Sequence, residues 1–287
     1  MKYGSYYGKM IFYGVMILVM TLAFSAATFA WFTSNSRVKS DVVSSRSGSE
    51  AVDLLVSLTG GASFRGEKEV DISQANSNGT ERLMPVSTAD LKNFVYNDAN
   101  EQSMAVHFAK ADPKYYYHFR VYLQAKAENH TANEKLLLFL DNADETGPLF
   151  QNATGNVLNA MRLGLVFDDD QTKILRVSEE KNPNQERSAN TRLNGVELKE
   201  NQVISSAQNT LRAVSDPSAP LAEYMVDEDG NVTSNGKGAL LKMDLNRIYS
   251  VDMFLYLEGC DPDCTDAIGL KELDFHLSFY GILEEAR

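Results

Sequence analysis

Apolar and polar residues alternate with a period of two in several well-separated segments, and this alternation limits the fold more than any other feature of the sequence. A period of two is typical of half-buried β-strands, because successive side chains of a strand point to opposite faces of a sheet. The pattern predicts strands over 51–58, 115–127, 161–168, 248–259 and 273–282. Segments 134–141 and 173–178 are further candidates. The apolar faces of the main strands comprise Val52, Leu54, Val56 and Leu58; Tyr115, Tyr117, Phe119, Val121, Leu123 and Ala125; Met161, Leu163, Leu165 and Phe167; Tyr249, Val251, Met253, Leu255 and Leu257; and Leu273, Phe275, Leu277 and Phe279.

Long polar connections separate these strands, which disfavours both tight hairpins and βαβ units. The sequence therefore predicts a mainly all-β domain over residues 50–287, an antiparallel two-sheet sandwich with a jelly-roll-like path and Greek-key crossings. Helical spacing in 87–99 and in 203–214 predicts short helices inserted between strands. Segments 179–202 and 215–238 are rich in Asn, Ser, Asp, Gly and Pro, which predicts long surface loops whose role stays open.

Residues 1–30 predict a hydrophobic N-terminal helix. Lys2 and Lys9 form a positive head, and the run 10–32 carries no charge. Such a segment is either a secretory signal peptide that is removed or an anchor that stays in the membrane, since the run is long enough for a hydrocarbon core of about 30 Å. Both alternatives place the rest of the chain at the cell surface or in the extracellular space, because the two lysines hold the start of the chain inside.

A cleavage site follows the apolar run. Thr28 and Ala30 fit the preference for small residues at positions −3 and −1 of a signal-peptidase site. Cleavage there leaves Trp31 as the first residue of the mature chain, and signal peptidase is then a partner of the precursor.

Charge and motifs exclude several classes of function. The formal net charge of −12 disfavours nucleic acid and anionic lipid as partners. The sequence contains no HExxH zinc motif, no GxSxG motif, no phosphate-binding loop and no dinucleotide fingerprint. We therefore expect no catalytic centre and no cofactor. We interpret His118 and His276, which fall within predicted strands, as ordinary surface residues, and the acidic run 168–170 as a solvated strand end.

The segment EGCDPDCTD, residues 258–266, is the densest cluster of reactive side chains. Cys260 and Cys264 flank a Pro-containing turn, and in an exported protein this spacing favours one local disulfide. Calcium is a weaker alternative, with the carboxylates of Asp261, Asp263 and Asp266 as candidate ligands. A plain loop between the last two strands is the third possibility.

Both ends of the chain resemble a known family. The segment ATFAWFTSNSRVKSD, followed by the strand AVDLLVSL, resembles the start of exported Gram-positive proteins of the TasA/camelysin type. The closing segment VDMFLYLEGCDPDCTDAIGLKELDFHLSFYG is similar to the end of the same proteins. The resemblance implies a jelly-roll-like sandwich and a subunit of a biofilm matrix fibre, in which the freed N-terminal segment of one subunit adds as a strand to the next. Camelysin was described as a metalloprotease, but this sequence has no metal-binding triad that supports that activity.

The segment 31–49 is the candidate assembly strand. Trp31 and Phe32 head it, and Val38, Val42 and Val43 lie among Ser and Thr, which tolerate an extended backbone. Such a segment could add to the sheet edge of a second copy and build a head-to-tail homopolymer. The alternatives are a disordered linker for this segment and, for the protein, a membrane-anchored surface module that binds a ligand or a carbohydrate through its loops.

Overall fold

The structure is a computed structural model, and the leader 1–30, with Thr28 and Ala30, lies outside the residues that it describes. The same holds for Trp31, Phe32, Cys260, Asp263 and Asp266. The described residues are 37–48, 52–73, 75–80, 83–97, 108–128, 134–141, 150–151, 156–177, 192–193, 196–197, 202–205, 212–215, 218–227, 230–232, 238–259, 261, 264 and 272–284.

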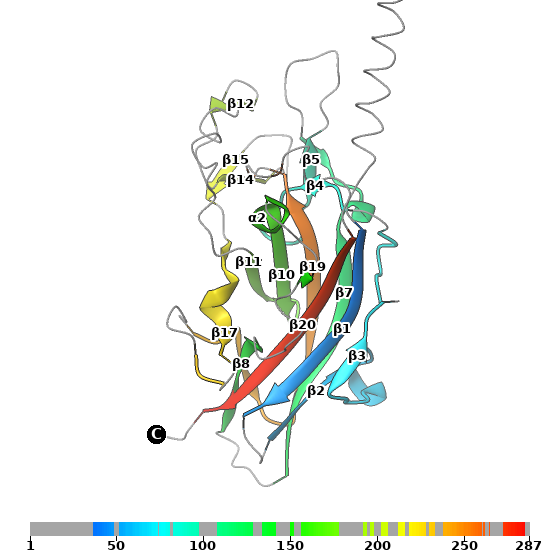
Figure 1. Ribbon diagram of the computed structural model, residues 1–287, viewed down its shortest axis with the longest axis vertical. Coiled ribbons are helices and arrows are strands. Elements are labelled where there is room, and N and C mark those ends of the chain that lie inside the picture. The colour runs from blue at the N-terminus through cyan, green and yellow to red at the C-terminus, as the bar shows by residue number, and fades with distance from the viewer. Residues whose placement is uncertain are drawn as a thin grey trace, which may run out of the picture.

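Most described residues belong to two large β-sheets (Figure 1). The first sheet has the order β17 (Met225–Val226), β8 (Lys135–Asp141), β20 (Glu272–Leu283), β1 (Arg37–Ser47) and β3 (Glu69–Asp71), with β18 (Leu241–Asp244) paired to β8 and β9 (Phe150–Gln151) paired to β20. The second sheet has the order β16 (Ala219–Pro220), β11 (Gln171–Arg176), β10 (Met161–Phe167), β19 (Ile248–Glu258), β7 (Tyr117–Ala127) and β2 (Val52–Ser57), with β4 (Pro85–Val86) paired to β19.

Smaller elements complete the described chain. They are the strand pairs β5 (Val95–Asn97) with β6 (Phe108–Lys110), β12 (Arg192–Leu193) with β13 (Val196–Glu197) and β14 (Gln202–Ser205) with β15 (Arg212–Ser215), the helix α2 (Asn156–Ala160), and the 3-10 turns η1 (Gly61–Ser63), η2 (Pro113–Tyr115) and η3 (Leu221–Tyr224).

The two sheets enclose one main core. Its buried cluster draws on the inward residues of both sheets, and the rings of Phe119 on β7 and Phe275 on β20 meet across it with centroids 6.0 Å apart. The predicted apolar faces of β2, β7, β19 and β20 are buried as expected, from Val52 to Val56 and from Phe275 to Phe279. Two predicted positions differ. Leu58 is 41% exposed beyond the end of β2, and Tyr115 is half-buried in the turn η2 rather than on the inward face of β7. The all-β sandwich is thus confirmed at the level of two packed sheets.

Strand β10 is buried on both faces rather than half-buried as its pattern predicted. An outer lid, residues 85–97 and 108–116, covers its far side with a second apolar cluster. Leu91 of the lid lies so close to Gly164 that a side chain at this glycine would collide with it. The glycine in an otherwise apolar strand therefore marks the place where the lid approaches.

The sheets are mixed, so the prediction of a purely antiparallel sandwich is wrong. Strand β1 runs parallel to β20, and parallel pairs also join β11 to β16, β8 to β17 and β19 to β4. The long β1–β20 pair joins the two ends of the described chain, where no short connection forces the strands to run in opposite directions.

Both predicted short helices are absent from the described parts of their segments. In 87–99, Thr88 accepts a hydrogen bond from the Leu91 amide at 3.1 Å, but the chain then turns at Leu91, whose φ is 55°, and enters β5. Leu91 and Phe94 pack into the lid cluster, and this tertiary contact overrides the helical spacing. In 203–214, the described residues form the paired strands β14 and β15.

The domain boundary also differs from the prediction. The sequence placed 31–49 outside a sandwich that began at residue 50, whereas residues 37–47 form β1 inside the first sheet. Val43 of this strand is fully buried in the main core. The sandwich of the described chain therefore begins at Arg37.

Candidate functional site

Strand β1 holds the described part of the predicted assembly strand. It occupies an inner position of the first sheet, parallel to β20 on one side and antiparallel to the short β3 on the other (Figure 1). Val38 is opposite Leu273, and Val43 is opposite Leu277. The ladder with β20 extends from Arg37 to Ser47, with an irregularity between Ser40 and Val42.

Few apolar side chains hold β1 in place. Among residues 42–47, whose side chains the structure describes, Val43 is the apolar residue that is fully buried. The next inward residue is Ser45, 6% exposed, whose hydroxyl donates to the Leu54 carbonyl of β2 at 2.8 Å. The Ser45 amide donates to the Lys68 carbonyl at 2.8 Å. Backbone and hydroxyl hydrogen bonds are thus a large part of what attaches this strand.

The outward side of β1 makes polar contacts that reach two strands away. Arg46 donates from Nε and from an Nη atom to the two carboxylate oxygens of Asp141 on β8, at 3.0 and 3.1 Å. The side chain of Arg46 crosses β20, where its guanidinium lies 4.9 Å from the ring centroid of Tyr280. Ser44 donates to the Ser278 hydroxyl at 3.0 Å.

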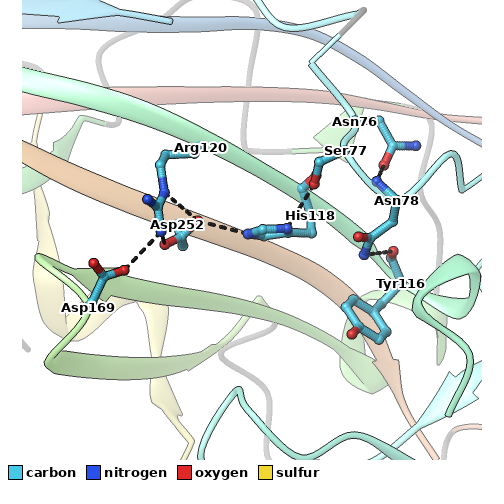
Figure 2. Close-up of polar contacts among 8 residues, drawn as sticks. All are labelled: Asn76, Ser77, Asn78, Tyr116, His118, Arg120, Asp169 and Asp252. Atoms are coloured by element: carbon cyan, nitrogen blue, oxygen red, sulfur yellow. Dashed lines mark hydrogen bonds and ion pairs between the residues drawn. The ribbon is translucent and has the colours of Figure 1, made fainter. Parts of the chain in front are cut away.

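A second polar cluster lies on the outward face of the second sheet. Figure 2 shows a continuous series of contacts from Asp169 through Arg120 and Asp252 to His118 and Ser77. His118 Nε2 is 2.8 Å from Asp252 Oδ1, and His118 Nδ1 is 2.8 Å from the Ser77 hydroxyl. His118 also stacks on Phe254, with ring centroids 4.5 Å apart. His118 lies on the outward face with 26% of its side chain exposed, as expected for a surface residue, but it is not free, because both ring nitrogens and one ring face have specific partners.

Asp252 is the charged centre of this cluster. Its side chain is 6% exposed, and Arg120, directly opposite on β7, donates to both of its carboxylate oxygens. Burial raises the pKa of Asp252, but hydrogen bonds from His118 and Arg120 outweigh burial and bring the pKa to about 2. The same hydrogen bond raises the pKa of the Arg120 guanidinium. Both groups are therefore charged at neutral pH.

Ser77, His118 and Asp252 have the connectivity of an acyl-transfer triad, and a carboxylate on Nε2 leaves Nδ1 as the acceptor for a serine hydroxyl. Two hydrogen bonds of Ser77 argue against a role as the nucleophile of such a triad. Its hydroxyl also donates to the His118 carbonyl at 2.9 Å, and its amide donates to the same carbonyl at 2.9 Å. These bonds fasten the 75–80 turn to the start of β7, so the geometry favours a structural clamp.

The segment 258–266 is fastened to the sandwich at its start. Asp261 accepts from the Arg162 guanidinium at 2.7 Å, and both side chains are buried, 8% and 3% exposed. Glu258, also buried, accepts from the Ser87 hydroxyl of the lid. Asp261, a candidate calcium ligand, therefore serves as the partner of a buried cation. The predicted Cys260–Cys264 disulfide stays a prediction, because Cys264 packs against the main core but Cys260 is outside the described residues.

The remaining candidates have structural partners. Asp168 and Asp169 form the turn after β10 with positive φ, and they contact Arg247 and Arg120 at 2.6 and 2.8 Å. His276 on β20 lies 3.4 Å from the Ser44 hydroxyl. The described part of the chain contains no group of three or more His, Cys, Asp or Glu side chains suited to a metal ion. Likewise, no helix among the described residues is long and apolar enough to cross a membrane.

Comparison with known proteins adds no relative. Neither protein-family models, nor curated proteins, nor solved structures include a match to this chain.

Proposed function

We propose that this protein is an exported structural subunit of a surface or matrix fibre, assembled by exchange of strand β1 between copies. The observation that supports this proposal is the position of β1. It is the first strand of the described chain, it begins at Arg37, a few residues after the predicted leader 1–30, and it fills an inner place of the first sheet between β20 and β3. An inner place vacated by one copy presents two hydrogen-bonding edges to the strand of another copy.

The energetics of β1 favour exchange. Copies of one chain offer identical contacts, so a strand that moves from its own sheet to a neighbour's sheet loses little enthalpy. The barrier depends on what must be exposed on the way, and each large buried side chain contributes about 1.5–3 kcal/mol. Among its described side chains, β1 buries one valine and one serine deeply. The release of this described part therefore exposes few large apolar side chains of the strand itself.

The polarity of the exchange predicts a filament. A copy that gives β1 to one neighbour and accepts the β1 of a different neighbour makes a head-to-tail contact, which propagates as a filament. Before cleavage the leader 1–30 ties the strand to the membrane, and cleavage after Ala30 frees it, so assembly follows export. The proposal places the mature protein outside the cell. Its leader is a hydrophobic N-terminal helix that lies in the membrane until signal peptidase removes it. The folded domain follows a jelly-roll-like path and has no catalytic role.

Cysteine cross-linking across the β1–β20 ladder tests the exchange. Ser44 and Ser278 are register partners with hydroxyl oxygens 3.0 Å apart, so Cys at both places is almost isosteric and can form a disulfide. The variants Ser44→Cys and Ser278→Cys are secreted separately, with Cys260 and Cys264 replaced by Ser. They are then mixed, assembled and oxidised. We expect covalent dimers on a non-reducing gel and fibres by electron microscopy.

Each variant oxidised without the other is the control, since neither contains both cysteines of the pair. A doubly substituted chain oxidised as a monomer should lock β1 in its own sheet and stay monomeric until it is reduced. Fibres that form normally from the locked chain, or a mixture that gives no more dimer than the controls, would contradict the exchange. The anchored surface module would then be the better proposal.

A further inference from the structure

We infer that Arg46, together with Ser45, sets the register in which β1 of a second copy enters the vacated place, with Asp141 as the residue that recognises it. This inference rests on the proposed strand exchange and adds to it the residues that choose the partner and its alignment. The chemical partner is a strand with an arginine next to a small hydroxyl residue, as in the sequence Ser45-Arg46 of the same chain.

The composition of β1 does not by itself select one register. Its sequence from Val42 to Ser47 is a valine pair, a serine pair, an arginine and a serine. Backbone hydrogen bonds are the same in every register, so a strand made of small residues can slip by two positions without turning its faces over. Specific side-chain contacts must therefore select one alignment.

Arg46 is suited to this selection because its side chain contacts two other strands at once, β20 and β8. Its guanidinium lies over the Tyr280 ring of β20 and ends in a two-point contact with Asp141 of β8. The Asp141 side chain is 5% exposed, so a slipped strand removes the guanidinium from a largely buried carboxylate. Arg46 itself is 46% exposed, but Asp141 loses a two-point charge-assisted contact when the guanidinium leaves, and neither Ser44 nor Gly48, the residues two positions away, can replace it.

Ser45 and Gly48 support the same alignment from the inner face and from the end of the strand. Slippage by two positions puts Val43 or Ser47 where Ser45 donates to the Leu54 carbonyl. If Val43 takes that place, Asp41 moves to the place of Val43 in the core, where an unpaired carboxylate is strongly disfavoured. At Gly48, any side chain would collide with the Tyr280 hydroxyl group.

A charge exchange between copies tests this inference. Each of the variants Arg46→Glu and Asp141→Lys places two like charges at the contact. When the two substitutions face each other, the glutamate and the lysine together span nearly the same length as the original arginine and aspartate. A single variant loses the contact both in its own sheet and between copies, so we expect its fibres to be irregular in register rather than absent. A mixture of the two should assemble at least roughly tenfold more strongly than either variant alone, because only contacts between unlike copies pair opposite charges. The chain with both substitutions should assemble without a partner.

Arg247 and Asp168 provide a matched control, since they form an ion pair at 2.6 Å on the second sheet, away from β1. A mixture of Arg247→Glu and Asp168→Lys should show no recovery of any loss seen in the single variants. Circular dichroism and analytical ultracentrifugation of every variant report folding and assembly.

The outcomes separate the two proposals. If the mixture assembles no more strongly than either variant alone while the Ser44–Ser278 cross-link forms between copies, exchange stands and the role of Arg46 is wrong. If the mixed Ser44→Cys and Ser278→Cys variants do not cross-link and the unmodified chain does not assemble, strand exchange fails and this inference fails with it.

Discussion

Strands β1 and β19 are both inner strands paired along most of their length, yet different forces hold them. The inward face of β19 buries Tyr249, Val251, Met253, Leu255 and Leu257 in the main core. The described inward face of β1 buries Val43 and Ser45. At about 1.5–3 kcal/mol for each large side chain, the apolar attachment of β19 is several times stronger than that of the described part of β1, residues 42–47. A strand held mainly by its backbone can be replaced by an equal strand, whereas a strand held by its side chains defines the core.

Truncation in β19 should have the largest effect. We expect Leu255→Ala to lower the free energy of unfolding by about 2–5 kcal/mol, because Leu255 is 1% exposed and its removal leaves a cavity between the sheets. Urea denaturation followed by circular dichroism measures this change. Leu58→Ala, at a 41% exposed leucine beyond β2, is the control and should change stability little. A loss below about 1 kcal/mol for Leu255→Ala would mean that β19 does not anchor the core.

The second-largest effect should come from acidification, which removes the stabilisation that the charge of Asp252 gives to β19. The pKa of Asp252 is lowered from 3.8 to about 2 in the folded protein, so the folded state favours the carboxylate. The resulting stability, about 2 kcal/mol, is present above about pH 4 and is lost as the pH falls towards 2. Unfolding free energies of the unmodified chain and of Asp252→Asn should therefore differ at pH 6 and converge near pH 2.

Asp169→Asn is the matched control for this prediction. Asp169 contacts the same arginine, but its side chain is 71% exposed, so its contribution is expected to be small. A difference between Asp252→Asn and the unmodified chain that stays constant from pH 6 to pH 2 would refute the assigned role of the Asp252 charge.

The smallest expected change in stability concerns β1. We expect Ser45→Ala to cost about 1 kcal/mol in the monomer, because it removes one hydrogen bond to the Leu54 carbonyl without opening a large cavity. Its effect on fibre alignment should exceed its effect on unfolding, which electron microscopy and urea denaturation compare directly. Ser44→Ala, on the outward face of the same strand, is the control. Equal losses of assembly in both variants would show that Ser45 has no special part in alignment.

Prediction from sequence succeeded where burial follows a regular pattern. Strands β7 and β20 alternate over most of their length, and β19 is apolar at every second position, so the inward residues of all three could be named in advance. It failed for β1, because a run of serines and adjacent valines has no alternation and resembles a linker. It also failed for 87–99, where packing of Leu91 and Phe94 against the second sheet outweighs helical spacing.

The outward cluster could not be predicted, because its members are far apart in the sequence. Ser77, His118 and Asp252 meet only after β7 and β19 have paired and the 75–80 turn has folded onto β7. One signal was present in the sequence. Asp252 is an acid in the middle of an otherwise mainly apolar strand, and a charge at such a place calls for a partner on the neighbouring strand.

The sequence by itself determined the β-class of the fold, the inward faces of the long strands and the expectation of a leader, because each of these depends on local periodicity or local composition. Only the tertiary structure decided that the N-terminal strand lies beside the C-terminal one, that the sheets are mixed, and that Arg46 contacts Asp141. These are pairings between residues about a hundred or more positions apart. Many pairings of alternating strands satisfy the same local pattern, and the choice among them depends on the combined packing and hydrogen bonding of the whole sandwich.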